Sequence, residues 1–572
     1  MKAMKSKKIS ITLLSLVMAI SIVLAGCSVN KGNSNNAKES QANPSSSASV
    51  ETAGASGEPA KQGYDDVLNI DWYVNLSWWK YPGDYGKDKF SQYIRDRFGL
   101  NINFITPAGD GSDQMSAMIA TGEIPDLVTV ESWLDYKTKL AKGGYLVSIN
   151  ELIEKYVPDF KPYQDIFNWY KESDGKTYAL PNYAYSSQAL KPGEQLEPNS
   201  AFTLRKDIYD KLGRPDISTA DKFLDVLERV KNEVKTYDGK SLIPLQLYEF
   251  TANGNGSASW LNEYFAVPYE DENGKLINRT YNPKYWEVIK FLNEAYRRGL
   301  ISKDNFTDKR DQINEKIASG RVFASLTAPQ DFSDPIRTLY TADNNAQYEA
   351  FALRNYEGEN PVLTDIRGFG WLVTLVGKDS KAQERIAKLL SFLNSKEGQH
   401  MVHFGWENET YTYNADGTIQ WTQEYKDAIA KGDSSEKKWG MGFNLQMDWY
   451  SVKDLFPQPE KPVDIYLAEK NMKKPLVQYS FDTSAVGGKP NPDHPDRDKM
   501  LETSNRLSLY WGKELPRIIL ADSEEKARAI FEDTLKKMDD MGRVKLDKYN
   551  DELFQGAKQA LGIERSWPPF RK

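Results

Sequence analysis

Apolar and polar residues alternate along residues 67–74, which is typical of a strand with one buried face. A helical spacing of apolar residues follows at 87–98 and ends at Gly99, and a second strand is expected at 101–105. A short helix that ends at Gly122 and a strand at 126–130 continue this order. Strands that alternate with helices predict an α/β fold with a mostly parallel sheet.

The alternation continues through the middle of the chain. Apolar residues line one face of a helix that begins near Ser218, and a second helix is bounded by Pro283 and Gly299. Strands are expected at 322–326 and 370–376, and a helix at 386–393. From residue 421 onward the pattern indicates helices and loops but does not predict how they pack.

The N-terminal residues have the pattern of an export signal. Four lysines precede an apolar stretch at 9–24, which is shorter than the ~20 apolar residues that a membrane span needs. The stretch runs into Leu24-Ala25-Gly26-Cys27, which holds the only cysteine and resembles the lipobox of bacterial lipoproteins. The resemblance implies a signal peptide at 1–26 and a lipid on Cys27; the alternative is an ordinary signal peptide with an incidental cysteine.

Residues 28–63 are rich in Ser, Ala, Gly, Asn and Gln, and Val29 and Val50 are their only large aliphatic residues. Such a segment buries too little apolar surface to offset the entropy of ordering. We therefore expect a lipid-anchored, disordered linker at 27–63 and a fold that begins at Tyr64.

The composition disfavours several classes of function. Lys and Arg number 74 against 81 Asp and Glu, so the chain has no basic excess for binding nucleic acid. One cysteine excludes a disulfide framework and any multi-cysteine metal site, and three histidines leave little imidazole chemistry. Aromatic residues are plentiful, which favours a binding protein over an enzyme.

Six segments resemble, in order, those of family 1 extracellular solute-binding proteins, the substrate-capturing subunits of bacterial ABC importers. The most specific is Gly122-Glu123-Ile124-Pro125-Asp126, which matches the family's G-x-x-P-D turn before a strand. The segments are 121–128, 144–152, 174–181, 204–213, 317–322 and 389–398. The chain length and the lipobox resemble the family's larger LplA-type branch, which includes binders of alginate oligosaccharides.

The resemblance implies a two-lobed, periplasmic-binding-protein-like (type II) α/β fold with a hinged cleft between the lobes. Lobe one would comprise 64–181 plus 350–400, and lobe two 182–349 plus 401–572. It further implies a monomer, held at the extracytoplasmic face of the cell membrane only by its lipid. This protein would bind an oligosaccharide and deliver it to the permease subunits of an ABC transporter, without a cofactor and without catalysis.

Motifs for catalysis and for metal binding are absent from the sequence. Residues 175–177 and 239–241 resemble the end of a phosphate loop, but both lack its first glycine and are better explained as Asp-Gly turns. His400 and His403 would share a helical face near Gly405, where they are expected to cap or pack rather than to bind zinc. The segment 236–244 lacks the acidic spacing of a calcium loop, so no metal site is expected.

Candidate ligand-binding residues follow from the strand ends, because ligands of open α/β sheets bind beyond the carboxyl ends of the strands. Indole and phenol rings offer flat apolar faces with a polar edge, which suits a sugar ring. Trp72 and Trp286 are assigned to the core instead. The predicted ligand-binding residues are Asn75, Trp78, Trp79, Glu131, Asn182, Tyr183, Trp260, Arg367, Trp371 and Trp406.

Two alternatives remain open at this point. The 81 acidic residues offer many carboxylate pairs of the kind that hydrolyse glycosidic bonds, so a surface-anchored polysaccharide-degrading enzyme is one alternative. A binding protein for peptides or another non-sugar solute is the other.

Overall fold

The computed structural model describes residues 63–186, 189–191, 194–252, 254–431, 435–456 and 472–563. The predicted signal peptide, Cys27 and the linker up to residue 62 lie outside the described residues. Tyr64, where the fold was expected to begin, already has a tertiary contact, since its ring lies 4.0 Å from the guanidinium of Arg385.

A five-stranded sheet, here called the first sheet, is built mainly from the N-terminal third of the chain. Its order is β2 (Leu100–Ile105), β1 (Leu68–Val74), β3 (Leu127–Glu131), β14 (Leu372–Val376) and β4 (Leu180–Pro181). Residues of β1 alternate between two buried faces: Trp72 packs in the core on one side and Tyr73 in the core on the other. Helices therefore cover both faces of this sheet.

The helices predicted at 87–98, before Gly122 and at 386–393 are present around the first sheet, together with others that were not predicted. Asp88 caps the first of them by accepting a hydrogen bond from the Ser91 amide (2.9 Å), and Gly99 ends it at φ 59°. These helices are α1 (Lys89–Phe98), α2 (Ser112–Thr121), α3 (Tyr136–Lys142), α4 (Ile149–Tyr156), α5 (Gln164–Trp169), α12 (Gln383–Leu393) and α13 (Lys396–Phe404).

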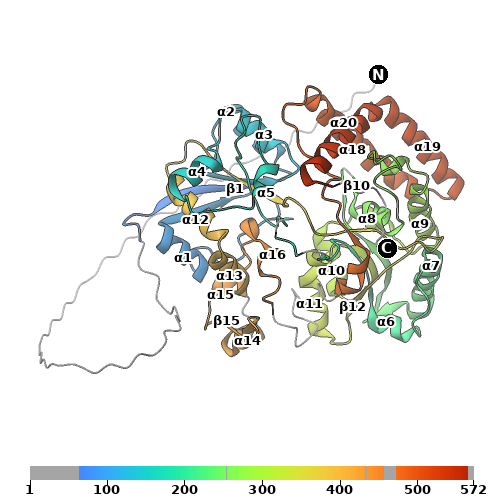
Figure 1. Cartoon of the computed structure of the whole chain (residues 1–572). Coiled ribbons are helices and arrows are strands. Elements are labelled where there is room, and N and C mark those ends of the chain that lie inside the picture. Colours follow the sequence, from blue (N-terminus) through green and yellow to red (C-terminus); the bar gives the residue numbers. More distant parts are fainter. Residues whose placement is uncertain are drawn as a thin grey trace, which may run out of the picture. The chain divides into compact units, whose positions relative to one another are not determined.

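A second, four-stranded sheet is formed by the middle of the chain. Its order is β12 (Tyr348–Phe351), β5 (Ala201–Arg205), β11 (Val322–Thr327) and β8 (Ile243–Leu247). Its helices form a group separate from those of the first sheet (Figure 1). They are α6 (Lys206–Lys211), α7 (Ala220–Arg229), α8 (Gly256–Tyr264), α9 (Tyr285–Arg297), α10 (Arg310–Ala318) and α11 (Ser333–Ala342).

The remaining elements are short pairs of strands and the helices of the C-terminal region. The strand pairs are β6 (Thr236–Tyr237) with β7 (Lys240–Ser241), β9 (Phe250–Thr251) with β10 (Gly254–Asn255), β13 (Leu363–Thr364) with β17 (Ser480–Phe481), and β15 (Tyr411–Tyr413) with β16 (Ile419–Trp421). The helices are α14 (Gln423–Ala430), α15 (Ser435–Trp439), α16 (Trp449–Val452), α18 (Arg497–Ile519), α19 (Glu524–Asp540) and α20 (Arg543–Leu561).

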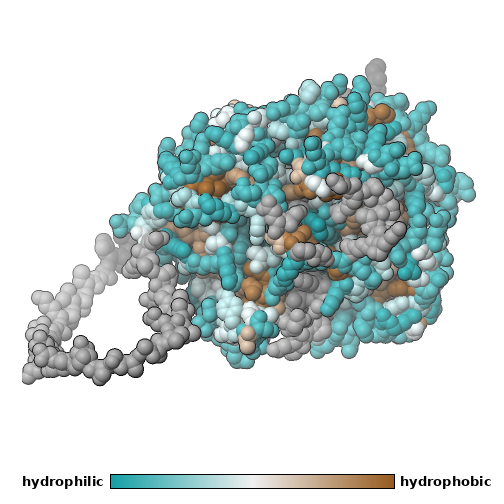
Figure 2. All heavy atoms as spheres, viewed as in Figure 1, coloured by the Kyte–Doolittle hydropathy of each residue, from teal (hydrophilic) through white to brown (hydrophobic). Residues whose placement is uncertain are grey.

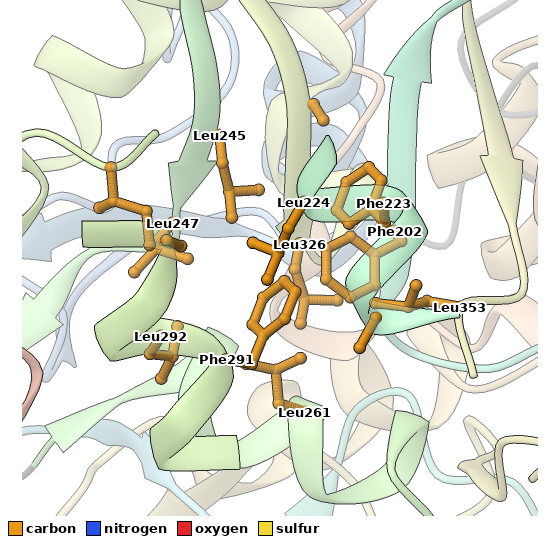
Figure 3. Packing of buried hydrophobic residues seen from close by; sticks show 14 of the residues in the cluster. Phe202, Phe223, Leu224, Leu245, Leu247, Leu261, Phe291, Leu292, Leu326 and Leu353 are labelled. Carbon is orange, nitrogen blue, oxygen red and sulfur yellow. The ribbon is translucent and has the colours of Figure 1, made fainter. Parts of the chain in front are cut away.

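The largest core lies beneath the second sheet. Phe202 of β5 and Phe223 of α7 meet edge to face, with their ring centroids 5.5 Å apart, and Phe291 of α9 stacks parallel to Phe223 (Figure 3). This core is separate from those of the first sheet, so each sheet has its own core.

On the face shown in Figure 2 the surface is mostly hydrophilic, and the hydrophobic residues form small separate patches.

The expectation of a mostly parallel sheet is confirmed only in part. Strands β1, β2 and β3 are parallel to one another, but β14 runs antiparallel to β3 and β4. The reason is the path of the chain, which leaves the first sheet through β4 for β5 and returns after β12 to enter β14 from the opposite end. The segments 182–200 and 352–371 therefore connect the two sheets.

Part of the region assigned to lobe two packs in the core of the first sheet. Phe443, Leu445 and Met447 lie in the same cluster as Trp72. They alternate along the chain with Asn444, which is half-buried, and Gln446, which is buried. The lobe boundaries themselves stay a prediction.

A chain of buried hydrogen bonds links three distant parts of the first sheet. Trp72 Nε1 donates to Thr129 Oγ1 (2.8 Å), whose hydroxyl lies 2.9 Å from that of Thr374 on β14. Gln446 Nε2 also donates to Thr374 Oγ1 (2.8 Å). Trp72, Thr129, Thr374 and Gln446 are all buried, so these hydrogen bonds form only when the three strands and the segment at Gln446 are in place.

Candidate ligand-binding site

Three strand ends of the first sheet meet at one edge. Val74, the last residue of β1, pairs with Thr129, and Glu131, the last residue of β3, pairs with Leu372 at the start of antiparallel β14. The residues that follow β1 and β3, and those that precede β14, therefore lie at the same edge. This is the edge beyond which ligands of open α/β sheets bind.

Three aromatic side chains gather at this edge, and we call them the aromatic platform: Trp78, Tyr183 and Trp371. The rings of Trp78 and Trp371 are parallel within 6°, with centroids 6.0 Å apart, and the Tyr183 ring lies 6.4 Å from Trp371. Trp78 is 62% exposed, and the other two are half-buried. An exposed indole held against a second indole is a preformed apolar surface for a flat ligand.

A polar pair, Asn75 and Glu131, lies at the ends of the same two strands. Asn75 is 3% exposed, and its Oδ1 accepts a hydrogen bond from the Tyr73 hydroxyl (2.9 Å). Its Nδ2 is buried without a hydrogen-bond partner among the described residues. Burial raises the pKa of the half-buried Glu131 carboxyl, and its own backbone amide and the Asn75 side chain oppose this rise. The Asn75 amide and the Glu131 carboxyl, side by side, therefore offer a hydrogen-bond donor and an acceptor at this edge.

The loop beside Asn75 requires a glycine. Gly111 has φ +80°, and a Cβ at this position would lie 1.9 Å from Asn75 Oδ1. Any side chain here would displace the amide. The backbone of this loop is thus shaped around Asn75.

Two other predicted residues have structural roles in the first sheet. Asn182 donates through Nδ2 to the Asn444 carbonyl (2.7 Å) and accepts at Oδ1 from the Leu372 amide (2.7 Å), so its side chain fastens the connecting segment. Trp79 is 3% exposed, and its Nε1 donates to Asn444 Oδ1 (2.9 Å). Because both side chains are buried and hydrogen-bonded, we remove them from the predicted ligand-binding set.

Arg367 and Trp406 also have partners within the protein. The Arg367 guanidinium forms ion pairs of 3.1 Å with both Asp365 and Asp482, and these neutralise its charge. Trp406 packs against the core of the first sheet, with the Lys89 amine 4.7 Å from its ring centroid. Both residues thus have contacts within the protein, and their part in ligand binding stays a prediction.

The second sheet carries a cluster of its own around Trp260, which we call the second-sheet cluster: Tyr248, Glu249, Trp260, Arg310 and Asp331. The parallel strands β8 and β11 end at one edge, and Tyr248 and Asp331 follow them. Tyr248 donates to Asp331 (2.6 Å), Arg310 donates to Glu249 (2.9 Å), and Trp260 meets Tyr248 edge-on at 5.3 Å. Burial raises the pKa of Asp331.

Only Trp260 of this cluster was predicted. Tyr248 and Glu249 come directly after β8, so the rule of strand ends applies to them. Neither Tyr248 nor Glu249 was predicted, because β8 itself was not predicted. Pro244 and Gln246 interrupt the apolar run of this strand. Arg310 and Asp331 reach the cluster through tertiary packing, which no local pattern reveals.

The two histidines of α13 are buried and pack against neighbouring side chains, and packing is one of the two roles, capping or packing, that the sequence predicts. His403 is 2% exposed and lies among the rings of Phe404, Trp449 and Phe456, and His400 lies 2.8 Å from the Tyr413 hydroxyl. Neither histidine provides a positive charge at the C-terminal end of the helix. Burial lowers the pKa of His403 to about 3 and that of His400 to about 4, so both are neutral at pH 7.

We expect His403 to make the protein sensitive to acid. An unfolded histidine takes up a proton below pH ~6.5, whereas folded His403 stays neutral down to a pKa of about 3. The stability that neutral His403 contributes is therefore complete above pH 6.5 and is lost as the pH falls toward 3. Between pH 7 and 5 the loss is about 2 kcal/mol.

The measurement is the free energy of unfolding in urea at pH 7 and pH 5. His403→Phe keeps an aromatic ring in the aromatic pocket and removes the titration, so its difference between the two pH values should be about 2 kcal/mol smaller than that of the wild type. An identical pH dependence in both proteins would show that His403 does not titrate in this way.

No group of three or more His, Cys, Asp or Glu side chains within the described ranges is arranged to hold a metal ion. The segment 236–241 instead forms the hairpin β6–β7, in which Asp238 and Gly239 both have positive φ (47° and 72°). This is the two-residue turn expected for Asp-Gly. In the part of the chain that the structure describes, no helix is long and apolar enough to cross a membrane.

Comparison with known proteins gives consistent results. The model of the bacterial extracellular solute-binding protein family matches residues 90–428. Over 253 residues, 42% of this chain and 45% of the relative, the sequence is 26% identical to the fructooligosaccharide ABC transporter substrate-binding protein FusA of Streptococcus pneumoniae serotype 4. Over 237 residues, 40% of this chain and 49% of the relative, it is 22% identical to the melibiose/raffinose/stachyose-binding protein MelE of Bacillus subtilis.

The chain thus spans less than half the length of these two curated relatives. The structural match is more extensive. The fold is similar to that of the S. pneumoniae substrate-binding protein FusA solved in complex with kestose, with a TM-score of 0.66 at 16% identity, and the match covers 86% of this chain and 100% of that chain.

Proposed function

The chain belongs to the family of bacterial extracellular solute-binding proteins, and we propose that it captures an oligosaccharide and delivers it to the permease of an ABC transporter. The observation that carries this proposal is the exposed stack of Trp78 on Trp371 beside Asn75 and Glu131. The relatives that are named for fructooligosaccharides and for raffinose-type sugars support the same class of ligand.

The chemistry of the site fits a sugar. A pyranose or furanose ring has C–H faces that pack on an indole and a rim of hydroxyls that need hydrogen-bond partners. The platform supplies the first, and the Asn75 amide donor and the Glu131 carboxylate acceptor supply the second. A flat apolar surface and polar groups thus meet at one edge.

Ligand transfer would use the two sheets as two lobes. The connecting segments 182–200 and 352–371 are the hinge in this proposal, and the second-sheet cluster is the surface that closes onto the ligand. A ligand that contacts both lobes favours the closed state only to the extent that it binds this state more tightly. The permease would then recognise the closed form.

The location and the assembly of the protein are also proposals. Membership of the family supports an extracytoplasmic location. We propose that a lipid on Cys27 is the only membrane attachment and that the mature protein is a monomer. Acyl chains contribute ~0.8 kcal/mol per buried CH₂, so a diacylglyceryl group would suffice for stable anchoring.

The test is a thermal-denaturation screen of the purified protein with neutral oligosaccharides, monosaccharides and peptides. Kestose, raffinose, stachyose and maltotriose represent the first group. A ligand at 100 times its dissociation constant stabilises the folded state by ~2.7 kcal/mol, which is readily detected as a higher melting temperature.

We expect at least one oligosaccharide to stabilise the protein and peptides not to do so. Stabilisation by peptides alone would overturn the proposal. Release of reducing ends from a bound sugar would show an enzyme rather than a transport protein.

A further inference from the structure

Two arginines near the candidate site, Arg367 and Arg310, are already paired with carboxylates. Arg367 is held between Asp365 and Asp482, and its side chain is 16% exposed. Arg310 of the second-sheet cluster lies 2.9 Å from Glu249 and 3.7 Å from Asp331. Lys473, which is also buried, lies near enough to Asp331 to lower the pKa of this carboxyl. With neighbouring Lys473 included, two cations face the two carboxylates of the cluster, so their formal charges balance.

The acidic groups Glu131 and Asp110 at the edge of the first sheet, by contrast, form no ion pair with the described residues. No cation contributes to the pKa of Glu131. Asp110 is a second acidic group near this edge, and it raises the pKa of Tyr73 and Tyr136. A ligand beside Glu131 thus meets a carboxyl group that no cation neutralises.

This distribution of charge has a consequence for the ligand. A carboxylated or sulfated sugar needs Arg or Lys to replace its lost hydration, and an unpaired acid nearby would repel it. A hydroxyl group has no such need, because it can donate to Glu131 and accept from Asn75 Nδ2. The site is suited to hydroxyls and not to acidic groups.

We infer that the site selects uncharged oligosaccharides and rejects sugars that carry carboxylates, with Glu131 as the residue that sets this preference. The inference rests on the proposed function and makes its ligand class narrower. Two features of the geometry point to it: the unpaired Glu131 beside the buried Asn75 donor, and the ion pairs that occupy Arg310 and Arg367.

The first experiment compares neutral and acidic ligands of equal length. Titration calorimetry is done with kestose, raffinose and maltotriose, with trigalacturonate and trimannuronate, and with the C6-oxidised form of any neutral sugar that binds. We expect a neutral sugar to bind at least a hundredfold more tightly than its oxidised form. A uronate that binds as tightly as the best neutral sugar would overturn the inference but leave the proposed function standing. A failure of every sugar, neutral or acidic, would instead count against the proposed function itself.

The second experiment tests Glu131 directly. Glu131→Gln keeps the shape and one acceptor oxygen but removes the charge. The affinity for the neutral sugar should fall by about three- to tenfold, because hydrogen bonds to a charged acceptor are stronger. The preference over the oxidised form should shrink by at least tenfold.

Glu123→Gln is the matched control. Glu123 is an exposed residue that precedes the first residue of β3, whereas Glu131 is the last residue of that strand. The substitution therefore changes the net charge equally, but not at the end of the strand that carries Glu131. It should leave both affinities unchanged. An equal effect of the two variants, or an unchanged preference in Glu131→Gln, would show that Glu131 does not set the selectivity.

Discussion

Replacing Trp78 by alanine is expected to lower the affinity for the bound sugar by about ten- to a hundredfold, or ~1.4–2.8 kcal/mol. The side chain is 62% exposed and stacks on Trp371, so its loss removes a ligand surface without opening a cavity. The free energy of unfolding of the ligand-free protein should change by less than about 1 kcal/mol. Calorimetry with the sugar identified by the screen and urea unfolding of the free protein measure the two effects.

The neighbouring residue provides the matched control. Trp79 is 3% exposed and packs against Phe104, with its ring centroid 5.2 Å from that of Phe104. Trp79→Ala should therefore cost ~3–5 kcal/mol of stability through the cavity it leaves. If Trp78→Ala unfolded the protein and Trp79→Ala did not, the assignment of one indole to the ligand and one to the core would be wrong.

The second large effect is expected for Gly512→Ala in α18. A Cβ at this position would lie 2.1 Å from the carbonyl oxygen of Ala252 and 3.0 Å from the amide nitrogen of Gly254. Because both are backbone atoms, α18 would have to move away from the segment that leads into α8 and Trp260. Overpacking of this kind costs ~3 kcal/mol, and we expect that loss in urea unfolding.

Gly556→Ala in α20 is the control for the helical glycine itself. No atom lies within 4 Å of the Cβ that would be added there, so alanine meets no obstacle. It should stabilise the protein by about 0.5–1 kcal/mol, since glycine is a poor residue for a helix interior. Equal effects of the two substitutions would show that the close approach of α18 to Ala252 carries no stability.

Local patterns were enough to predict much of the fold. The strand around Trp72, the helix that ends at Gly99 and the strand before Glu131 were predicted within one or two residues, because periodicity and caps are encoded nearby in the chain. The direction of β14 was not predicted, because it depends on where the connecting segment re-enters the sheet.

The candidate site could be predicted only in outline. The strand-end rule led to the edge that holds Asn75 and Trp78. It could not distinguish Trp78 from Trp79, because the local backbone conformation determines which of the two adjacent indoles is buried. Arg367 was predicted to bind a ligand. Its pairing with Asp482 could not be predicted, because the two residues are 115 positions apart in the sequence. Pairings over such distances exist only in the folded chain.

The buried hydrogen bond between Thr129 and Thr374 affects the order in which the protein can fold. The two residues are 245 positions apart, and Gln446 joins them from a further 72 positions along the chain. While the protein is being made, β1, β2 and β3 must wait for β14 before their sheet can close, and the core of the second sheet must wait for α18 and α19, which contribute Leu515 and Phe531 to it. Neither sheet is thus complete with its core until late in synthesis. Pairings of such long range fold slowly and leave sheet edges exposed, so the newly made chain has a long interval in which it depends on protection from aggregation.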